Sequence, residues 1–110
     1  MEQHVKILVI NPGSTSTKVA LFEDEKRIVE KKIDHSRMEL SGFSSIKAEL
    51  PMRIDRVREF LDENEIDLCE LDVIVSRGGI LPPVRHGAYV IDDELVETLL
   101  DRPVEQHASN

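Results

Sequence analysis

The sequence predicts an α/β or α+β domain with a mixed sheet that opens with three antiparallel strands and has helices packed on it. Residues 5 to 11, 17 to 23 and 26 to 33 are apolar or β-branched stretches of strand length with short connections between them. Residues further along show helical spacing, a fourth apolar stretch and a second helical pattern. This succession indicates one sheet covered by helices.

The first three strands are expected from their side chains and their turns. Large apolar residues suited to a buried strand fill the first stretch: Val5, Ile7, Leu8, Val9 and Ile10. After a turn, the second stretch continues with Val19, Leu21 and Phe22. The acidic connection at residues 23 to 25 is so short that the second and third strands should form a hairpin.

Two helices are expected next. Ser36 suits an N-cap and Glu39 stands at capping-box spacing, so a short helix should begin there. Pro51 suits the first turn of a longer helix that runs to about residue 64. Apolar residues recur in this helix at spacings of three and four: Ile54, Val57 and Leu61. Its charged residues, Arg53 among them, are expected on a solvated face.

The second half of the chain should add to the sheet. Residues 72 to 76 form an apolar stretch that predicts a buried strand, and residues 87 to 91 predict another. Asp92 and Asp93 then suit the cap of a final helix. The apolar positions of that helix are Leu95, Val96, Leu99 and Leu100.

Composition limits the kind of partner. The chain has 22 acidic and 14 basic residues and a net charge of −8, which disfavours nucleic acid and anionic membranes. We see no membrane-spanning run and no signal peptide, and one cysteine, Cys69, suits a reducing cytoplasm. No two histidines have metal-ligand spacing, and His4 and His35 are expected at the surface.

The connection between the first two strands has the character of an anion site. It reads Asn-Pro-Gly-Ser-Thr-Ser-Thr-Lys from Asn11 to Lys18. Gly13 allows a close approach of backbone to a ligand or a positive φ, and Pro12 contributes no N–H. The amides of residues 13 to 17 and the hydroxyls of residues 14 to 17, with the ammonium of Lys18, would then surround an anion.

Two familiar phosphate motifs do not fit this turn. A Walker A loop needs glycine before the lysine, where Thr17 stands, and a dinucleotide fingerprint needs further glycines after Gly13. A plain β-hairpin accounts for the composition equally well, because proline, glycine, serine and threonine all favour turns. On composition alone, both interpretations stay open.

The same run resembles the opening phosphate loop of the acetate and butyrate kinase family, within the actin, sugar kinase and Hsp70 superfamily of ATPases. It is closer to the butyrate kinase branch, because acetate kinases have alanine after the asparagine and a run of serines. Two further segments extend the resemblance: Ser-Arg-Gly-Gly-Ile-Leu-Pro-Pro at residues 76 to 83 and Glu-Gln-His-Ala-Ser-Asn at residues 105 to 110. The three motifs occur in order and span nearly the whole chain.

The resemblance implies a fold, a domain and an activity. The fold would be part of a ribonuclease H-like, actin-like ATPase domain. Residues 1 to 110 would be a partial N-terminal phosphate-binding domain of a two-domain kinase, with the second domain outside this chain. Butyrate kinases transfer the γ-phosphoryl group of ATP, with Mg²⁺, to a short-chain carboxylic acid, reversibly. The chain alone would be inactive, and the enzyme cytoplasmic.

The resemblance also assigns roles within the turn. Asn11 would lie near the Mg²⁺ ion and the phosphates. Ser14 and Ser16 would donate to the phosphates or hold waters of the metal shell. Gly13 and Thr15 belong to the same nucleotide-binding loop, and Lys18 would add positive charge beside it.

Arg77 is the candidate catalytic residue outside the turn. It follows a predicted strand and, with Gly78 and Gly79, would contact the acyl or phosphoryl group, although an ordinary surface arginine at a turn is the alternative. Acetate kinases have His-Arg-Val-Val-His-Gly-Gly here, and aligning the glycines puts Ile74 opposite their arginine. Their substrate-binding arginine therefore does not transfer directly to Arg77. His107, in the last motif, would help to shape the substrate site.

Two other classes of function stay open at this stage. One is another kinase of the superfamily, such as a sugar, acetate or propionate kinase. The other is a non-catalytic anion-binding or interaction module. Exposed apolar faces and strand edges would also allow a homo-oligomer.

Overall fold

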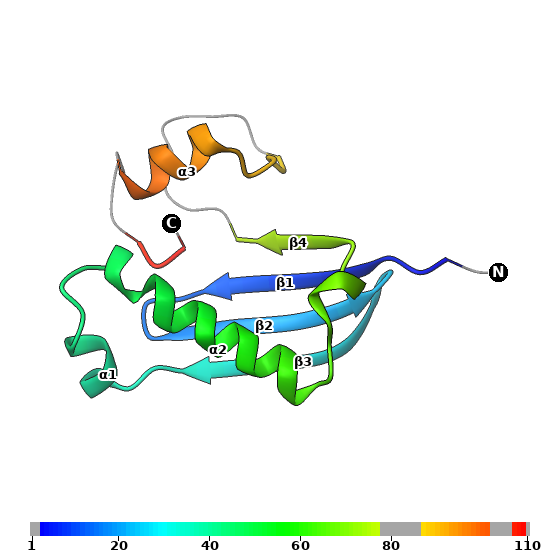
Figure 1. Ribbon diagram of the computed structural model, residues 1–110, viewed down its shortest axis with the longest axis horizontal. Helices are drawn as coiled ribbons and strands as arrows, with labels where there is room; N and C mark the ends of the chain where they lie inside the picture. Colours follow the sequence, from blue (N-terminus) through cyan, green and yellow to red (C-terminus); the bar gives the residue numbers. More distant parts are fainter. Residues whose placement is uncertain (1–2, 78–86, 102–106, 110) are drawn as a thin grey trace.

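The computed structural model describes residues 3–77, 87–101 and 107–109 of the chain. Its centre is a four-stranded sheet in the order β3 (Lys26–Asp34), β2 (Ser16–Glu23), β1 (Lys6–Pro12) and β4 (Val73–Ser76), with the long helix α2 (Leu50–Glu63) lying along one face (Figure 1). Neighbouring strands of β1, β2 and β3 are antiparallel, whereas β4 is parallel to β1. The predicted mixed α/β class is confirmed.

A tight acidic turn joins β2 to β3, as the hairpin prediction requires. Asp24 takes the left-handed conformation, with φ 55°. Its carboxylate accepts a hydrogen bond from the backbone N–H of Val5 at 2.9 Å and lies 2.7 Å from Nδ1 of His4. The bond from Val5, followed by that to His4, lowers the pKa of Asp24 below its ordinary value. These contacts tie the start of the chain to the turn.

The predicted helix starts are confirmed. The hydroxyl of Ser36 accepts from the backbone N–H of Glu39 at 3.0 Å, and the carboxylate of Asp92 accepts from that of Leu95 at 2.8 Å. The helices are α1 (Arg37–Ser41), α2 (Leu50–Glu63) and α3 (Asp93–Leu100), with 3₁₀ turns η1 (Lys47–Glu49) and η2 (Leu68–Glu70). None of the helices in the described ranges is both long and apolar enough to cross a bilayer.

The core lies between the sheet and α2. Leu8 and Val19 on the sheet pack with Phe60 and Leu61 on the helix. Ile54, which the sequence places on the apolar face of α2, is instead 40% exposed. The buried stripe of the helix consists of Arg53, Val57, Phe60 and Leu61.

Two of the predictions about polar residues are wrong. Arg53 was expected on the solvated face but is only 8% exposed, because its position, seven residues before Phe60, faces the sheet. His35 was expected at the surface but is only 5% exposed, since its ring turns inward to hydrogen-bond Thr17. Both side chains belong to the network beneath the turn after β1.

The predicted strand at residues 87 to 91 is also wrong. These residues have no strand pairing within the described part of the chain, and Val90 and Ile91 are 87% and 61% exposed. β-branched residues favour a strand only where a neighbouring edge supplies hydrogen-bond partners and a surface to pack on. The stretch instead leads into the Asp92 cap of α3.

Candidate phosphate-binding site

Internal hydrogen bonds tightly shape the β1–β2 turn (residues 13 to 15). The N–H of Gly13 donates to the carbonyl of Ser16 at 2.7 Å and closes the turn. The N–H of His35 donates to the carbonyl of Thr15 at 2.8 Å. Arg53 donates to the carbonyls of Ser14 at 3.3 Å and Ser16 at 3.0 Å. Three successive carbonyls are thus held by protein donors.

The amides of the turn offer donors to a ligand. Ser14 and Thr15 are exposed, and their backbone N–H groups have no acceptor among the residues that the structure describes. Successive free amides in a tight turn form a concavity that binds anions. The backbone of Gly13 does not have a positive φ. A Cβ at this position would lie 3.3 Å from Oγ of Ser16, so close packing against Ser16 favours glycine here. The arrangement suits a phosphate group.

Strand alternation places the predicted ligand residues on one face of the sheet. Asn11 on β1 is paired in register with Lys18 on β2, and Ser16 lies two residues before Lys18, so all three share the face opposite α2. Thr17 lies on the helix side and is 1% exposed. Its hydroxyl, expected among the ligand donors, is therefore committed to the interior.

Lys18 has a carboxylate partner on the neighbouring strand. Its Nζ lies 2.9 Å from Oε1 of Glu30 on β3. The hydrogen bond from Lys18, with the nearby positive charge, lowers the pKa of Glu30. Lys18 therefore contributes a partly neutralised charge beside the turn.

A buried polar network supports the turn from the helix side. Arg53 on α2 donates to the hydroxyl of Thr17 at 3.0 Å and to the carboxylate of Glu49 at 3.2 Å. The Thr17 hydroxyl in turn lies 2.8 Å from Nε2 of His35. Because the guanidinium only donates, the hydroxyl accepts from Arg53, and it shares a second hydrogen bond with the imidazole of His35. Burial, followed by the charge of Arg53, lowers the pKa of His35 and favours its neutral form.

Sequence reasoning missed this network, although the helix period contained one signal. Arg53 precedes Val57 by four residues and Phe60 by seven, which places it on the buried stripe. A charged residue at such a position requires buried partners. No local pattern pointed to His35, whose burial depends on its contact with Thr17 across 18 residues of chain.

The second motif lies next to the first in space. The N–H of Arg77 donates to the carbonyl of Ile10 at 3.1 Å, directly before Asn11. This proximity follows from the parallel pairing of β1 and β4, which puts their carboxyl ends at the same edge. Arg77 is exposed and has no carboxylate partner within the described ranges. Gly78 and Gly79 lie outside the described residues.

The third motif reaches the same end of the sheet. His107 lines a small hollow together with Arg53, Leu50 and Leu100, and its Nδ1 lies 2.7 Å from Oγ of Ser109. Figure 1 shows residues 107–109, the β1–β2 turn and the end of β4 at one end of the molecule. Residues far apart in the sequence thus lie toward the same end of the sheet, with His107 on the α2 side beside Arg53.

The turn carries oxygen donors of the kind that Mg²⁺ binds. In the described part of the chain, no group of three or more His, Cys, Asp or Glu residues is placed to hold a metal ion. Mg²⁺ in kinase sites is held largely by phosphate oxygens and water, with few protein ligands. The amide oxygen of Asn11 and the hydroxyls of Ser14 and Ser16 are suitable partners for such an ion and its waters.

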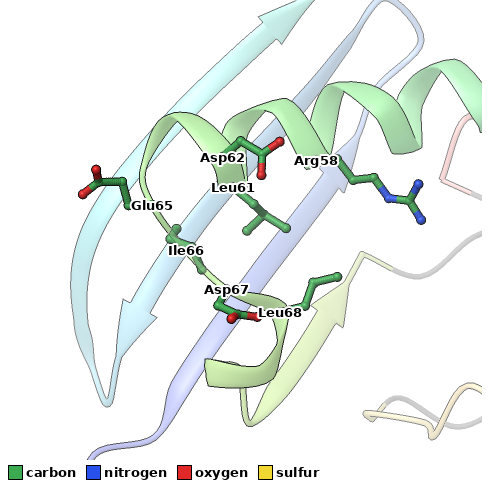
Figure 2. Close-up of a pocket in the computed structure, with 7 residues that line it drawn as sticks. All are labelled: Arg58, Leu61, Asp62, Glu65, Ile66, Asp67 and Leu68. Carbon is green, nitrogen blue, oxygen red and sulfur yellow. The ribbon is translucent and has the colours of Figure 1, made fainter.

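A separate surface hollow lies at the other end of α2 (Figure 2). It contains three carboxylates and a single cation, Arg58. Its lining residues are Arg58, Leu61, Asp62, Glu65, Ile66, Asp67 and Leu68. One carboxylate oxygen of Asp67 is already occupied by the backbone N–H of Cys69 at 2.9 Å. This excess of negative charge repels anions and excludes the hollow as a phosphate site.

The fold and the turn define the class of protein as an α/β domain with a candidate anion-binding turn at a sheet edge. Comparison with known proteins is more specific. The chain is 47% identical over 105 residues to the probable butyrate kinase 2 of Caldanaerobacter subterraneus subsp. tengcongensis and to the probable butyrate kinase of Thermotoga petrophila. It is 46% identical to the probable butyrate kinase 1 of Thermotoga maritima.

These similarities agree with the resemblance: the chain is similar to probable butyrate kinases over almost its whole length. Each covers 96% of this chain but only 29 to 30% of the relative. The chain thus spans less than a third of the length of the curated relatives it matches. No family model matches the chain.

Proposed function

We propose that this chain supplies the phosphate-binding part of a short-chain fatty acid kinase of the butyrate kinase type. Such an enzyme transfers the γ-phosphoryl group of ATP to a carboxylate and forms an acyl phosphate, reversibly. The observation that carries the proposal is the β1–β2 turn, with carbonyls held inward and amides free, in a chain 47% identical to probable butyrate kinases.

The proposed domain is the opening part of a ribonuclease H-like, actin-like ATPase fold. Three antiparallel strands followed by a parallel fourth strand beside the first support this assignment. Residues 1 to 110 would be part of the N-terminal domain, and a second domain would complete the nucleotide site. An ATP-dependent kinase of this type is expected in the cytoplasm.

The turn would bind the phosphates of ATP and its Mg²⁺ ion. The free amides of Ser14 and Thr15 would donate to phosphate oxygens, with the hydroxyls of Ser14 and Ser16 beside them. Asn11 shares a sheet face with Ser16 and would hold the metal or one of its waters. Mg²⁺ neutralises charge on the phosphates. Lys18 would add a weaker, partly paired charge.

Arg77 would act on the acceptor side. A carboxylate and a γ-phosphate repel each other, so a cation must offset their charge as they approach in line. Arg77 stands beside Ile10, has no carboxylate partner in the described ranges and presents a planar fork that suits either anion. His107 and the glycines after Arg77 would shape the acid site. No general base is needed, because a carboxylic acid is already ionised at neutral pH.

Two assays test the proposal. The protein that contains this sequence should form acyl phosphate from ATP, Mg²⁺ and acetate, propionate, butyrate or isobutyrate, trapped as the hydroxamate. No activity on any of these acids, with phosphorylation of a sugar instead, would refute a fatty acid kinase. Formation of neither product, with anion binding retained, would favour a binding module.

The second assay uses the chain itself. Addition of ATP and Mg²⁺ should shift the amide resonances of residues 13 to 17. Ser14→Ala should lower the affinity for the nucleotide about tenfold, because the lost hydrogen bond to a charged phosphate corresponds to a change of about that size. Ser44→Ala is the matched control, because Ser44 is exposed and lies outside the turn. Shifts confined to other regions would contradict an anion site at the turn.

A further inference from the structure

We infer that Arg53 is a positioning residue that holds the β1–β2 turn in its anion-binding shape from the side opposite the ligand. The inference rests on the proposed function of the turn as a phosphate site. It goes beyond that proposal, because Arg53 belongs to none of the three motifs and touches no part of the ligand face.

The contacts of Arg53 converge on the turn from α2. Its Nη2 donates to the carbonyl of Ser14 at 3.3 Å, and its Nη1 donates to the carbonyl of Ser16 at 3.0 Å. The same two nitrogens reach the hydroxyl of Thr17 at 3.0 Å and the carboxylate of Glu49 at 3.2 Å. The two terminal nitrogens of the guanidinium are therefore fully engaged in four contacts.

Peptide geometry connects these contacts to ligand binding. In a trans peptide, the carbonyl and the following N–H point in opposite directions. Arg53 holds the carbonyl of Ser14 inward, so the N–H of Thr15 must point outward, and this N–H has no acceptor among the described residues. The N–H of His35 orients the next peptide in the same way through the carbonyl of Thr15. Of the two free amides of the turn, that of Thr15 is thus aimed by Arg53 from beneath, and the contact of His35 fixes the peptide that follows it.

Burial and charge limit Arg53 to this role. The residue is 8% exposed, so its guanidinium does not reach a ligand on the opposite face. Glu49, 7% exposed, lies at 3.2 Å and balances its charge. A planar fork with fixed donor directions orients two carbonyls at once, which the single ammonium of a lysine does not.

Arg53→Lys is the main test, since it keeps the buried charge beside Glu49 and removes the fork. Arg53→Met removes every donor, and Arg58→Met, exposed on the same helix, is the matched control. Amide spectra of the ligand-free chain would be recorded first, followed by titration with ATP and Mg²⁺ and, separately, with inorganic phosphate.

Arg53→Lys should move the amide resonances of Ser14, Thr15 and Ser16 while the core amides of Leu8 and Val19 stay in place. It should also weaken nucleotide binding about tenfold or more, with Arg58→Met unchanged. Unmoved turn resonances, or an affinity within about twofold of the parent chain, would overturn the inference. A purely structural role would instead shift the core and turn amides together, which also overturns it.

The ligand-free spectra keep this test separate from the proposed function. If the parent chain binds neither nucleotide nor phosphate, the proposed function fails, yet a selective change at residues 14 to 16 in Arg53→Lys still supports the positioning role. If Arg53→Met does not fold, the outcome is decided by Arg53→Lys.

Discussion

Replacing Thr17 by valine separates hydrogen bonding from packing beneath the turn. The two side chains have nearly the same shape, and Thr17 is 1% exposed, so the change leaves no cavity and removes only the hydroxyl. That hydroxyl accepts from Arg53 at 3.0 Å and lies 2.8 Å from Nε2 of His35. Thr17→Val therefore leaves a buried cation and a buried imidazole each short of one partner.

The expected cost follows from these two contacts. A hydrogen bond to a charged group contributes about 1.5 to 3 kcal/mol and a neutral one about 0.5 to 1.5 kcal/mol. Arg53 keeps the carbonyl of Ser16 at 3.0 Å as a second acceptor for the same nitrogen, which favours the lower part of the range. We expect the free energy of unfolding to fall by about 2 to 3 kcal/mol, a large share of the roughly 5 to 15 kcal/mol typical of a domain.

Urea unfolding followed by circular dichroism measures this loss. With an m-value of about 2 kcal/mol/M, the midpoint should fall by about 1 to 1.5 M urea at unchanged m. Thr98→Val is the matched control, because its hydroxyl makes one solvent-exposed bond of 2.8 Å to the carbonyl of Glu94. The control should change stability by about 0.5 kcal/mol or less. Equal losses in the two variants would refute the argument from buried partners.

Three further predictions follow from the core, the buried imidazole and the turn. Phe60 is 1% exposed, so Phe60→Ala should cost about 3 to 5 kcal/mol in urea unfolding. Ile54→Ala, at a position 40% exposed, should cost far less; the reverse order would contradict the observed core. Burial lowers the pKa of His35 in the folded chain. As the pH decreases below the ordinary value of 6.5, the unfolded chain therefore takes up a proton that the folded chain resists, and the free energy of unfolding should decrease. His35→Gln should reduce this loss of stability between about pH 7 and pH 5.5. The raised pKa of His4 has the opposite effect, because it makes the folded chain less stable as the pH rises above 6.5. An unchanged dependence of stability on pH in His35→Gln would exclude His35 as its source. The Gly13→Ala variant should fold, since φ is not positive at this position. Its Cβ would lie 3.3 Å from Oγ of Ser16, so the affinity for phosphate, measured by amide shifts, should decrease. An unchanged affinity would show that the Ser16 hydroxyl does not bind the phosphate.

Much of the fold was predictable because its signals are local. The caps at Ser36 and Asp92 each depend on a contact three residues away, and the β2–β3 hairpin follows from one short turn. The strand predicted at residues 87 to 91 failed for the opposite reason. A strand is completed by an edge elsewhere in the molecule, and the described structure provides no pairing there.

The candidate site divides in the same way. Its motif residues, from Asn11 to Lys18 and at Arg77, were recognisable because the donors stand in sequence order. Arg53 and His35 are wrongly expected at the surface, since their roles depend on burial and on a partner, Thr17, that lies 36 and 18 residues away. A charged side chain has the same local pattern whether it faces water or the interior.

The sequence by itself thus determined the four observed strands, the helix caps, the hydroxyl-rich turn and the resemblance to butyrate kinases. Only the tertiary structure decided that Arg77 lies beside Ile10, that Thr17 turns away from the ligand face and that Arg53 holds the turn from below. The physical reason is that backbone propensity acts over a few residues. Burial and hydrogen-bond partners are set by which segments the folded sheet brings together.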